Sequence, residues 1–173
     1  MRIRREKDDS LTVTLPMGEA VMLKRLPARL RGLIEEPDFT SRAVGRLFPR
    51  AYADGEKEAE YRKLLGDDLR QRKLECIRAF ESTLAKCSVK HWNVDIRIRP
   101  EEFELWLGFV NDMRLVLGME LDIQDDDWGR HFDPAHPRAD ELALLHYLSW
   151  LEEEMLRARS GDEYYSPRRS RRK

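Results

Sequence analysis

The feature that most constrains the fold is a change of hydrophobic period across one proline, Pro100. Before it, apolar residues of the stretch 92–98 alternate with polar ones, which is the pattern of a half-buried strand. After it, apolar residues recur every three or four positions over 100–119, which indicates an amphipathic helix. Because proline is tolerated in the first turn of a helix, we expect the strand to lead directly into the helix.

A similar arrangement stands near the N-terminus. Residues 11–15 alternate like a strand, Pro16 follows, and a helical pattern then continues to residue 34. Each of the two units places the end of a strand beside the start of a helix, so both can share one small sheet against a helical core. A further strand candidate at 2–6 is separated from 11–15 by residues with turn chemistry, which predicts an N-terminal hairpin.

The remaining periodicity is helical. It predicts helices over 17–34, 41–48, 56–86, 100–119 and 139–158. Pro27 falls inside the first of these stretches and is expected to kink or split it, and Gly66 can interrupt the longest. The expected fold class is mostly α with a small β portion (α+β), with four to five helices packed beside a short three-stranded sheet.

The length of 173 residues suits one domain, predicted over 1–158 with the N-terminal hairpin included. The stretch 159–173 has no core-forming pattern and is expected to be a disordered basic tail. The tail carries five cations that can attract nucleic acid weakly and without sequence preference: Arg168, Arg169, Arg171, Arg172 and Lys173. The alternative is a tail that only keeps the protein in solution.

Composition narrows the class of protein. Apolar residues make up 41% of the chain, enough for a core, and Lys plus Arg (32) nearly equals Asp plus Glu (33), so no strong overall field steers anions. No stretch approaches the ~18 uninterrupted apolar residues of a membrane span, and the N-terminus has no apolar region typical of a secretory signal. With two cysteines, which indicate reduced thiols, the chain is expected to be cytoplasmic.

No catalytic set can be assembled from the sequence. Neither a Gly-x-Ser-x-Gly motif nor a nucleotide-binding glycine pattern occurs, and we expect no enzyme activity, no cofactor and no metal. His131, Asp133 and His136 lie close together and suggest a rival, a small metal-dependent hydrolase. The alternative is a polar loop in which His136 helps to start the last helix. A stoichiometric ion in the purified protein would favour the hydrolase.

The two cysteines are eleven residues apart on the same predicted helix. Their Cα atoms would be about 16 Å apart at the helical rise per residue, whereas a disulfide needs a separation below roughly 7 Å. Cys76 borders the apolar stripe and is expected to be a small core residue. Cys87, at the end of the helix near Lys86 and Lys90, is the better candidate for a reactive thiol because nearby cations favour the thiolate.

Asn111, Asp112 and Arg114 form a polar group among apolar neighbours on the helix after Pro100. Asn111 and Arg114 are three residues apart and are therefore neighbours on the helix surface. The guanidinium of Arg114 can hold a carboxylate or a carbonyl in a bidentate contact. We interpret the group as a structural network that docks this helix against a loop, with an interaction site for a partner as the alternative.

Three blocks of the sequence carry a resemblance to a known family: 17–26 with 33–34, 46–52 with 60–62, and 110–118 with His136, Pro137 and 147–151. The second block contains a Leu-x-Pro-x-x-Tyr element, and the third is the most specific. Together they resemble a bacterial family best known in actinobacteria, a domain of unknown function with some members described as oxidative-stress transcriptional regulators (AosR-like). The similarity covers about residues 1–158.

The resemblance implies a mostly helical fold with a small β portion and, in some members, gene regulation through a sigma-factor partner. Genes of the family often lie beside the adaptor of the Clp protease, which implies a proteolysis-linked alternative. We therefore expect a non-enzymatic regulatory protein that binds a sigma factor or RNA polymerase, or else Clp components. A redox mechanism carries over only if Cys76 and Cys87 correspond to the sensing pair of such members, and neither lies in a matched block.

Overall fold

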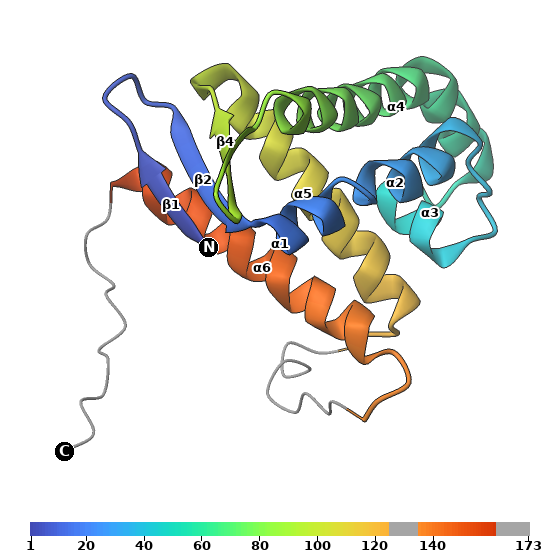
Figure 1. The fold of residues 1–173 in the computed structure, drawn as a ribbon. Helices are drawn as coiled ribbons and strands as arrows, with labels where there is room; N and C mark the ends of the chain where they lie inside the picture. Colours follow the sequence, from blue (N-terminus) through green and yellow to red (C-terminus); the bar gives the residue numbers. More distant parts are fainter. Residues whose placement is uncertain (125–134, 162–173) are drawn as a thin grey trace.

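The computed structural model describes residues 1–124 and 135–161, drawn in colour in Figure 1. Four strands and six helices follow one another in this part of the chain: β1 (Arg2–Arg5), β2 (Leu11–Pro16), α1 (Met17–Leu23), α2 (Leu26–Glu35), α3 (Arg42–Leu47), α4 (Gly55–Ala85), β3 (Ser88–Lys90), β4 (Asn93–Ile98), α5 (Pro100–Glu120) and α6 (Ala139–Ser160). The α+β class expected from the sequence is confirmed.

The strands form one antiparallel sheet in the order β1-β2-β4-β3. In its centre β2 pairs with β4, so that Leu11 lies opposite Ile98 and Pro16 lies opposite Asn93. The two strand–proline–helix units of the sequence therefore share one sheet, as expected. The predicted number of three strands is wrong, because β3 has only three residues and so shows no alternation that a sequence pattern can detect. The predicted number of four to five helices is also too low.

Alternation along β2 and β4 separates a buried face from an open one. Apolar side chains of the buried face are at most 1% exposed, among them Val13 and Ile96. α6 packs against β1 and β2, α4 packs against β4, and α5 runs through the middle of the helical layer in contact with α3, α4 and α6 (Figure 1). No helix in the part of the chain that the structure describes is long and apolar enough to cross a membrane.

The proline in the first helical stretch divides it. α1 ends at Leu23 and α2 begins at Leu26, with Pro27 in its first turn, where the missing proline N–H leaves no helical bond unmade. The predicted split is confirmed. Gly66 does not interrupt α4, which continues for 31 residues through it.

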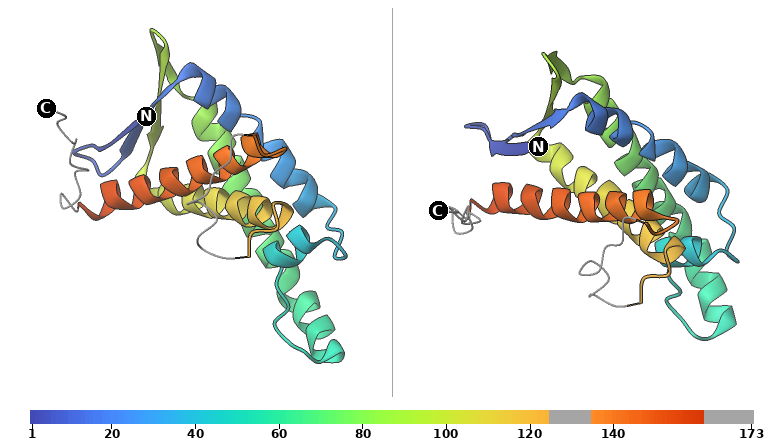
Figure 2. Two further views of the ribbon diagram at one scale, coloured as in Figure 1. Left: turned by 90° about the horizontal axis from the view of Figure 1, so that it is seen from below. Right: turned by 60° about the horizontal axis from the view of Figure 1, so that its bottom comes forward.

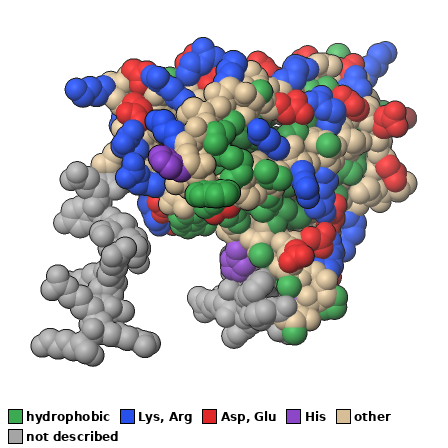
Figure 3. Space-filling view, viewed as in Figure 1, with side chains coloured by type: hydrophobic (Ala, Val, Ile, Leu, Met, Phe, Trp, Pro, Cys, Tyr) green, Lys and Arg blue, Asp and Glu red, His purple; other side chains and the backbone are tan. Residues whose placement is uncertain are grey.

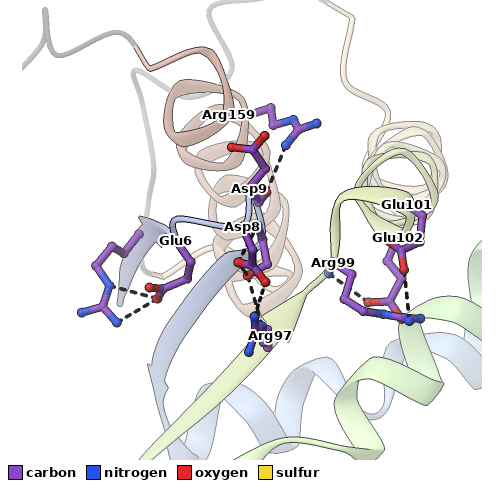
Figure 4. A network of polar contacts seen from close by, with 10 residues as sticks. Glu6, Asp8, Asp9, Arg97, Arg99, Glu101, Glu102 and Arg159 are labelled. Carbon is purple, nitrogen blue, oxygen red and sulfur yellow. Dashed lines mark hydrogen bonds and ion pairs between the residues drawn. The ribbon is translucent and has the colours of Figure 1, made fainter.

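Polar contacts fasten the β1–β2 hairpin to the end of α6 and to β4 (Figure 4). Arg159 donates to the backbone oxygen of Asp9 at 3.0 Å, and Arg5 donates in return to the backbone oxygen of Arg159 at 3.1 Å. Arg97 of β4 forms an ion pair with Asp8 in the hairpin turn. The contacts of Arg159 hold the C-terminal end of α6 against the hairpin.

Charged side chains of both signs are interspersed over the face drawn in Figure 3, in agreement with the balanced charge of the chain. Hydrophobic side chains gather near the centre of that face. Among the large apolar residues that the structure describes, Trp92 of the β3–β4 turn has the largest exposed fraction, 85%.

Candidate functional site

The first half of α4 borders a hollow that apolar side chains line. Figure 2 shows this end of the helix extending beyond the other helices, accompanied by the chain that precedes it. The hollow has a volume of about 380 Å³ and is lined by Pro37, Phe39, Phe48, Pro49, Tyr61, Arg62, Lys63, Gly66, Asp67, Leu69 and Arg70. We refer to these residues as the α4 groove.

Glu58 holds the chain that precedes α4 against the helix. Its carboxylate accepts hydrogen bonds from the backbone N–H groups of Ala51 at 2.9 Å and Tyr52 at 3.0 Å, and from Arg62 Nε at 2.6 Å. The residue is buried although it is charged. The guanidinium of Arg62, followed by the backbone donor of Tyr52, lowers the pKa of the Glu58 carboxyl. The chain before α4 is therefore held in place by charge-assisted hydrogen bonds rather than by regular structure.

Aromatic rings form the sides of the groove. The rings of Phe39 and Phe48 meet edge to face with centroids 6.2 Å apart, and the Arg62 guanidinium lies 4.4 Å from the centroid of Phe39. On the other side, Tyr52 and Tyr61 are 5.8 Å apart, also edge to face. Arg62 thus contacts both the buried carboxylate of Glu58 and an aromatic wall.

Tyr61 also lines a second, more open hollow, which has a volume of about 490 Å³. Its lining residues are Tyr52, Lys57, Glu60, Tyr61 and Leu64. Leu64 is 67% exposed and Phe39 is 53% exposed. Tyr61 lines both hollows, and from here on we include the residues of both in the α4 groove.

Basic side chains outnumber acidic ones among the lining residues of the first hollow, whereas the second has one of each. Four basic residues line them (Lys57, Arg62, Lys63 and Arg70), whereas Glu60 and Asp67 are the acidic ones. Arg70 donates to Asp67 through Nη2 at 3.1 Å. Its Nε is buried and has no hydrogen-bond partner among the described residues. An N–H left in this state is unfavourable.

A buried ion pair lies behind the groove, at the boundary between the two halves of α4. Lys73 Nζ is 2.7 Å from Asp112 Oδ1 on α5, with side chains 13% and 7% exposed. The same Nζ lies 5.9 Å from the ring centroid of Phe48, a groove residue. Burial raises the pKa of the Asp112 carboxyl even though the ammonium of Lys73 opposes that shift. Lys73 therefore connects a wall of the groove to the central helix.

The polar group on α5 divides between different neighbours. Asp112 contacts Lys73 of α4, whereas Arg114 donates to Ser149 Oγ at 3.0 Å and forms an ion pair with Glu152, both on α6. Asn111 is exposed on α5. Asp112 and Arg114 dock α5 onto two helices and not onto a loop, which corrects the interpretation made from the sequence.

The cysteines do not meet. Cys76 is 6% exposed and packs in the core, as predicted, where Gly108 of α5 leaves room for its sulfur: a Cβ at position 108 would stand 2.9 Å from Sγ. Burial raises the pKa of the Cys76 thiol, which disfavours the reactive thiolate. Cys87 is partly buried and follows the end of α4 at Ala85. The prediction that both cysteines lie on one helix is therefore wrong.

Of the three candidate metal ligands, His136 is the one that lies in the part of the chain that the structure describes. His136 is exposed and its Nδ1 accepts from the backbone N–H of Arg138 at 3.1 Å. His131 and Asp133 lie outside the described residues, as do the basic residues 168–173 of the tail. Within residues 1–124 and 135–161, no three His, Cys, Asp or Glu side chains come close enough to hold a metal ion.

The groove was not identified from the sequence as a site, although two signs of it are present there. Its aromatic residues occur where helical periodicity is weak, in the stretch 36–54 and early in α4. The matched block 46–52 with 60–62 supplies residues to both of its walls. Aromatic residues and arginine are enriched at protein interfaces, and the groove contains both.

Comparison with known proteins gives a family without an activity. A family model described as "Domain of unknown function (DUF2017)" matches residues 1–159, which include the whole α4 groove. No curated protein and no solved structure matches the chain.

Proposed function

Because the chain belongs to the DUF2017 family, whose description names no activity, we propose from its geometry that it is a non-enzymatic regulatory protein that binds a partner protein through the α4 groove. The observation that carries this proposal is the groove itself: two hollows on a protruding half-helix, the first lined by exposed Phe39 and the second by exposed Leu64. Contiguous exposed apolar surface of this kind marks interaction sites in soluble proteins.

The energetics of the groove favour association. Complete burial of a Leu or Phe side chain contributes about 1.5–3 kcal/mol relative to full exposure. Leu64 is 67% exposed and Phe39 is 53% exposed, so a partner that covered both would recover a substantial part of that amount for each.

The groove is also formed before any partner arrives. Glu58 holds residues 51 and 52 against α4 by hydrogen bonds at 2.9 and 3.0 Å, and Arg62 packs on Phe39. A surface that is already ordered loses less conformational entropy on binding than a loop that must fold. This arrangement suits a preorganised docking site.

We propose control of transcription in a stress response as the cellular role, with a sigma factor or RNA polymerase as the partner. The support for this role is the resemblance of the three sequence blocks to a family with such regulators. The structure contributes the surface by which such a partner can be bound. An adaptor role in Clp proteolysis would use the same surface with a different partner, and the experiment below separates the two roles.

The test is affinity capture from the native cell with three forms of the full chain. They are the wild type, Leu64→Glu in the groove, and Leu156→Glu as a matched control on α6, where Leu156 is 48% exposed. We expect wild type and control to retain the same partner and Leu64→Glu to lose it. Recovery of a sigma factor or RNA polymerase supports the role in transcription, and recovery of Clp subunits replaces it with the adaptor role. Equal recovery by all three forms contradicts the docking site.

A further inference from the structure

We infer that the β3–β4 turn and the adjoining α1 bind the surface of an anionic lipid bilayer, with Trp92 at the level of the lipid headgroups. The inference goes beyond the proposed function, because it concerns a different surface and a different class of ligand. None of its residues lines the α4 groove. Binding of this kind needs no membrane span, since a protein can lie on a bilayer through apolar side chains and cations.

Three exposed apolar side chains belong to this part of the fold, and we call them the tip surface. Trp92 is 85% exposed, Val89 of β3 is 59% exposed and Val21 of α1 is 44% exposed. The N–H of Met17, at the start of α1, donates to the backbone oxygen of Trp92 at 2.9 Å, and Val21 lies about one helical turn further along. Hydrophobic side chains accordingly gather over the turn and α1 in Figure 3.

The turn that carries Trp92 is tight and is fixed to the body of the protein. Lys90 pairs with Asn93, so His91 and Trp92 alone connect the two strands. His91 has a φ of 56°, a conformation that glycine would adopt with less strain. Strain that persists in an exposed turn is a sign of function. Because the backbone bond to Met17 also holds the turn, Trp92 can enter a bilayer with little loss of backbone entropy.

Basic side chains adjoin the tip surface on two sides. Residues 82–94, which include the turn, contain Lys86 and Lys90 and no Asp or Glu. Lys24 and Arg25 are exposed and follow Val21 by three and four residues in helical conformation, so they are its neighbours on the surface of α1. Lys and Arg side chains border the gathered hydrophobic ones in Figure 3.

The acidic residues of the same elements are engaged elsewhere or are outnumbered. Glu19 of α1 accepts a hydrogen bond from the hydroxyl of Tyr147 on α6 at 2.9 Å. Asp95 of β4 lies 3.5 Å from Lys90 Nζ. The four cations beside the tip surface therefore exceed its acidic neighbours, and the local charge is positive.

An apolar tip with a basic border matches an anionic bilayer. Tryptophan is enriched at the membrane–water interface, where its ring is buried and its N–H stays near water. Anionic headgroups attract Lys and Arg side chains that lie within a Debye length of them. A single strand of nucleic acid would instead follow a basic groove with successive aromatic rings. Val21 and Val89 are aliphatic and offer no ring on which a base can stack, so the surface favours a bilayer.

The test is co-sedimentation of the full chain with vesicles of phosphatidylglycerol and phosphatidylcholine in equal parts, and with vesicles of phosphatidylcholine alone. We expect the protein to bind the anionic vesicles and to bind them less as salt rises. Trp92→Ala should weaken this binding about tenfold, because the inserted ring is lost. The control Leu156→Ala, at a 48% exposed position on α6, should bind like wild type.

A second pair of variants tests the basic border. Arg25→Gln should weaken binding about fivefold, the contribution of one cation near an anionic surface. Arg46→Gln removes the same charge from an exposed position on α3 and should have no effect. No binding to anionic vesicles, equal binding to both kinds of vesicle, or equal binding by wild type and Trp92→Ala overturns the inference. Equal binding by Arg25→Gln and Arg46→Gln overturns it as well. Binding of a short oligo(dT) that Trp92→Ala abolishes, without binding of vesicles, overturns it in favour of a nucleic acid.

Discussion

The two halves of α4 belong to one uninterrupted helix but differ in burial. In the second half, Leu74, Ile77, Phe80 and Leu84 are at most 9% exposed and pack in the core. In the first half, the helix extends away from the body and carries Leu64 in solvent at 67% exposure (Figure 2). The backbone geometry is the same in both halves, so the difference comes from what faces the helix.

The neighbours of each half explain the contrast. The second half faces α5, whose Trp106 and Phe109 stack around Phe80. The first half faces a stretch without regular structure, which Glu58 fastens in place. Packing between regular elements produces stability, whereas packing against a fastened loop leaves apolar surface available for a partner. Each prediction below changes one half or the boundary between them.

The largest expected effect is on the buried half. Phe80→Ala removes a ring that is 0% exposed, with centroids 3.9 Å from Phe109 and 4.3 Å from Trp106, and should lower the free energy of unfolding by about 3–5 kcal/mol. Urea denaturation measures this loss. Phe39→Ala in the groove is the matched change and should lose far less, because the ring is already half exposed. Equal losses for the two variants would remove the contrast between the halves.

The boundary between the halves should respond next. Lys73→Met leaves the Asp112 carboxylate buried without its partner, so the free energy of unfolding should fall by about 3 kcal/mol near neutral pH. The double variant Lys73→Met/Asp112→Leu should recover most of this loss, because it replaces both charges with apolar groups. Urea denaturation of the two variants measures both free energies of unfolding. A single variant as stable as wild type would mean that Lys73 does not stabilise the boundary.

The pH dependence at this boundary has a defined sign. The folded-state pKa of Asp112 is raised, so the folded protein holds this proton more tightly than the unfolded chain does. Stability from Asp112 is therefore greatest below the unfolded pKa and falls as pH rises through the folded pKa. Lys73→Met raises the folded pKa further, so its loss of stability should be smaller at about pH 5 than at about pH 8.

Arg114→Ala tests a contact remote from both halves. It removes the bonds to Ser149 and Glu152 and should lower the free energy of unfolding by about 1–3 kcal/mol, since partly buried acceptors on α6 lose their donor. Thermal denaturation provides the measurement. Partner capture should be unchanged in the folded variant. An unchanged melting temperature combined with loss of the partner would instead make Arg114 part of an interaction site.

A smaller effect, limited to acid, is expected from Glu58→Gln. The pKa of Glu58 is lowered in the folded state, so its contribution is fully present above the unfolded value of 4.5 and is lost as pH falls through the folded pKa. The melting temperature of wild type should therefore fall more steeply below about pH 4.5 than that of Glu58→Gln. Parallel curves for the two proteins would show that Glu58 does not fasten the wall of the groove.

Leu64→Glu should have the smallest effect on stability, within about 0.5 kcal/mol, as expected for an exposed position. Binding of the partner should nevertheless be lost, because a carboxylate then occupies the apolar surface. Denaturation and affinity capture of the same preparation measure the two quantities. A large loss of stability in this variant would place Leu64 among the residues that hold the fold together.

Features that depend on a local pattern could be predicted from the sequence, whereas contacts between distant residues could not. The switch of period at Pro100 located β4 and α5, and Pro27 located the break between α1 and α2, because each is a local pattern. β3 was missed because Ser88–Lys90 is too short to show a period. Pairings such as Lys73 with Asp112 join residues far apart in the chain, so no spacing reveals them.

The groove was missed for a further physical reason. Its walls come from a stretch without periodicity and from half of a helix whose outward residues resemble those of any solvated helix. The aromatic residues at positions 39, 48, 52 and 61 were the available sign, but their meeting at one surface depends on the hydrogen bonds of Glu58. A buried carboxylate that organises a loop cannot be told from a surface carboxylate in a sequence where 38% of residues are charged.

The most direct test of the partner-binding groove is photo-cross-linking in the native cell. p-Benzoylphenylalanine is placed singly at position 64 in the groove, at position 156 on α6 and at position 92 in the exposed β3–β4 turn, where Trp92 is 85% exposed. The account predicts a discrete cross-linked partner from position 64 and none from 156 or 92. A partner captured from position 92 or 156 but not from 64 would contradict it.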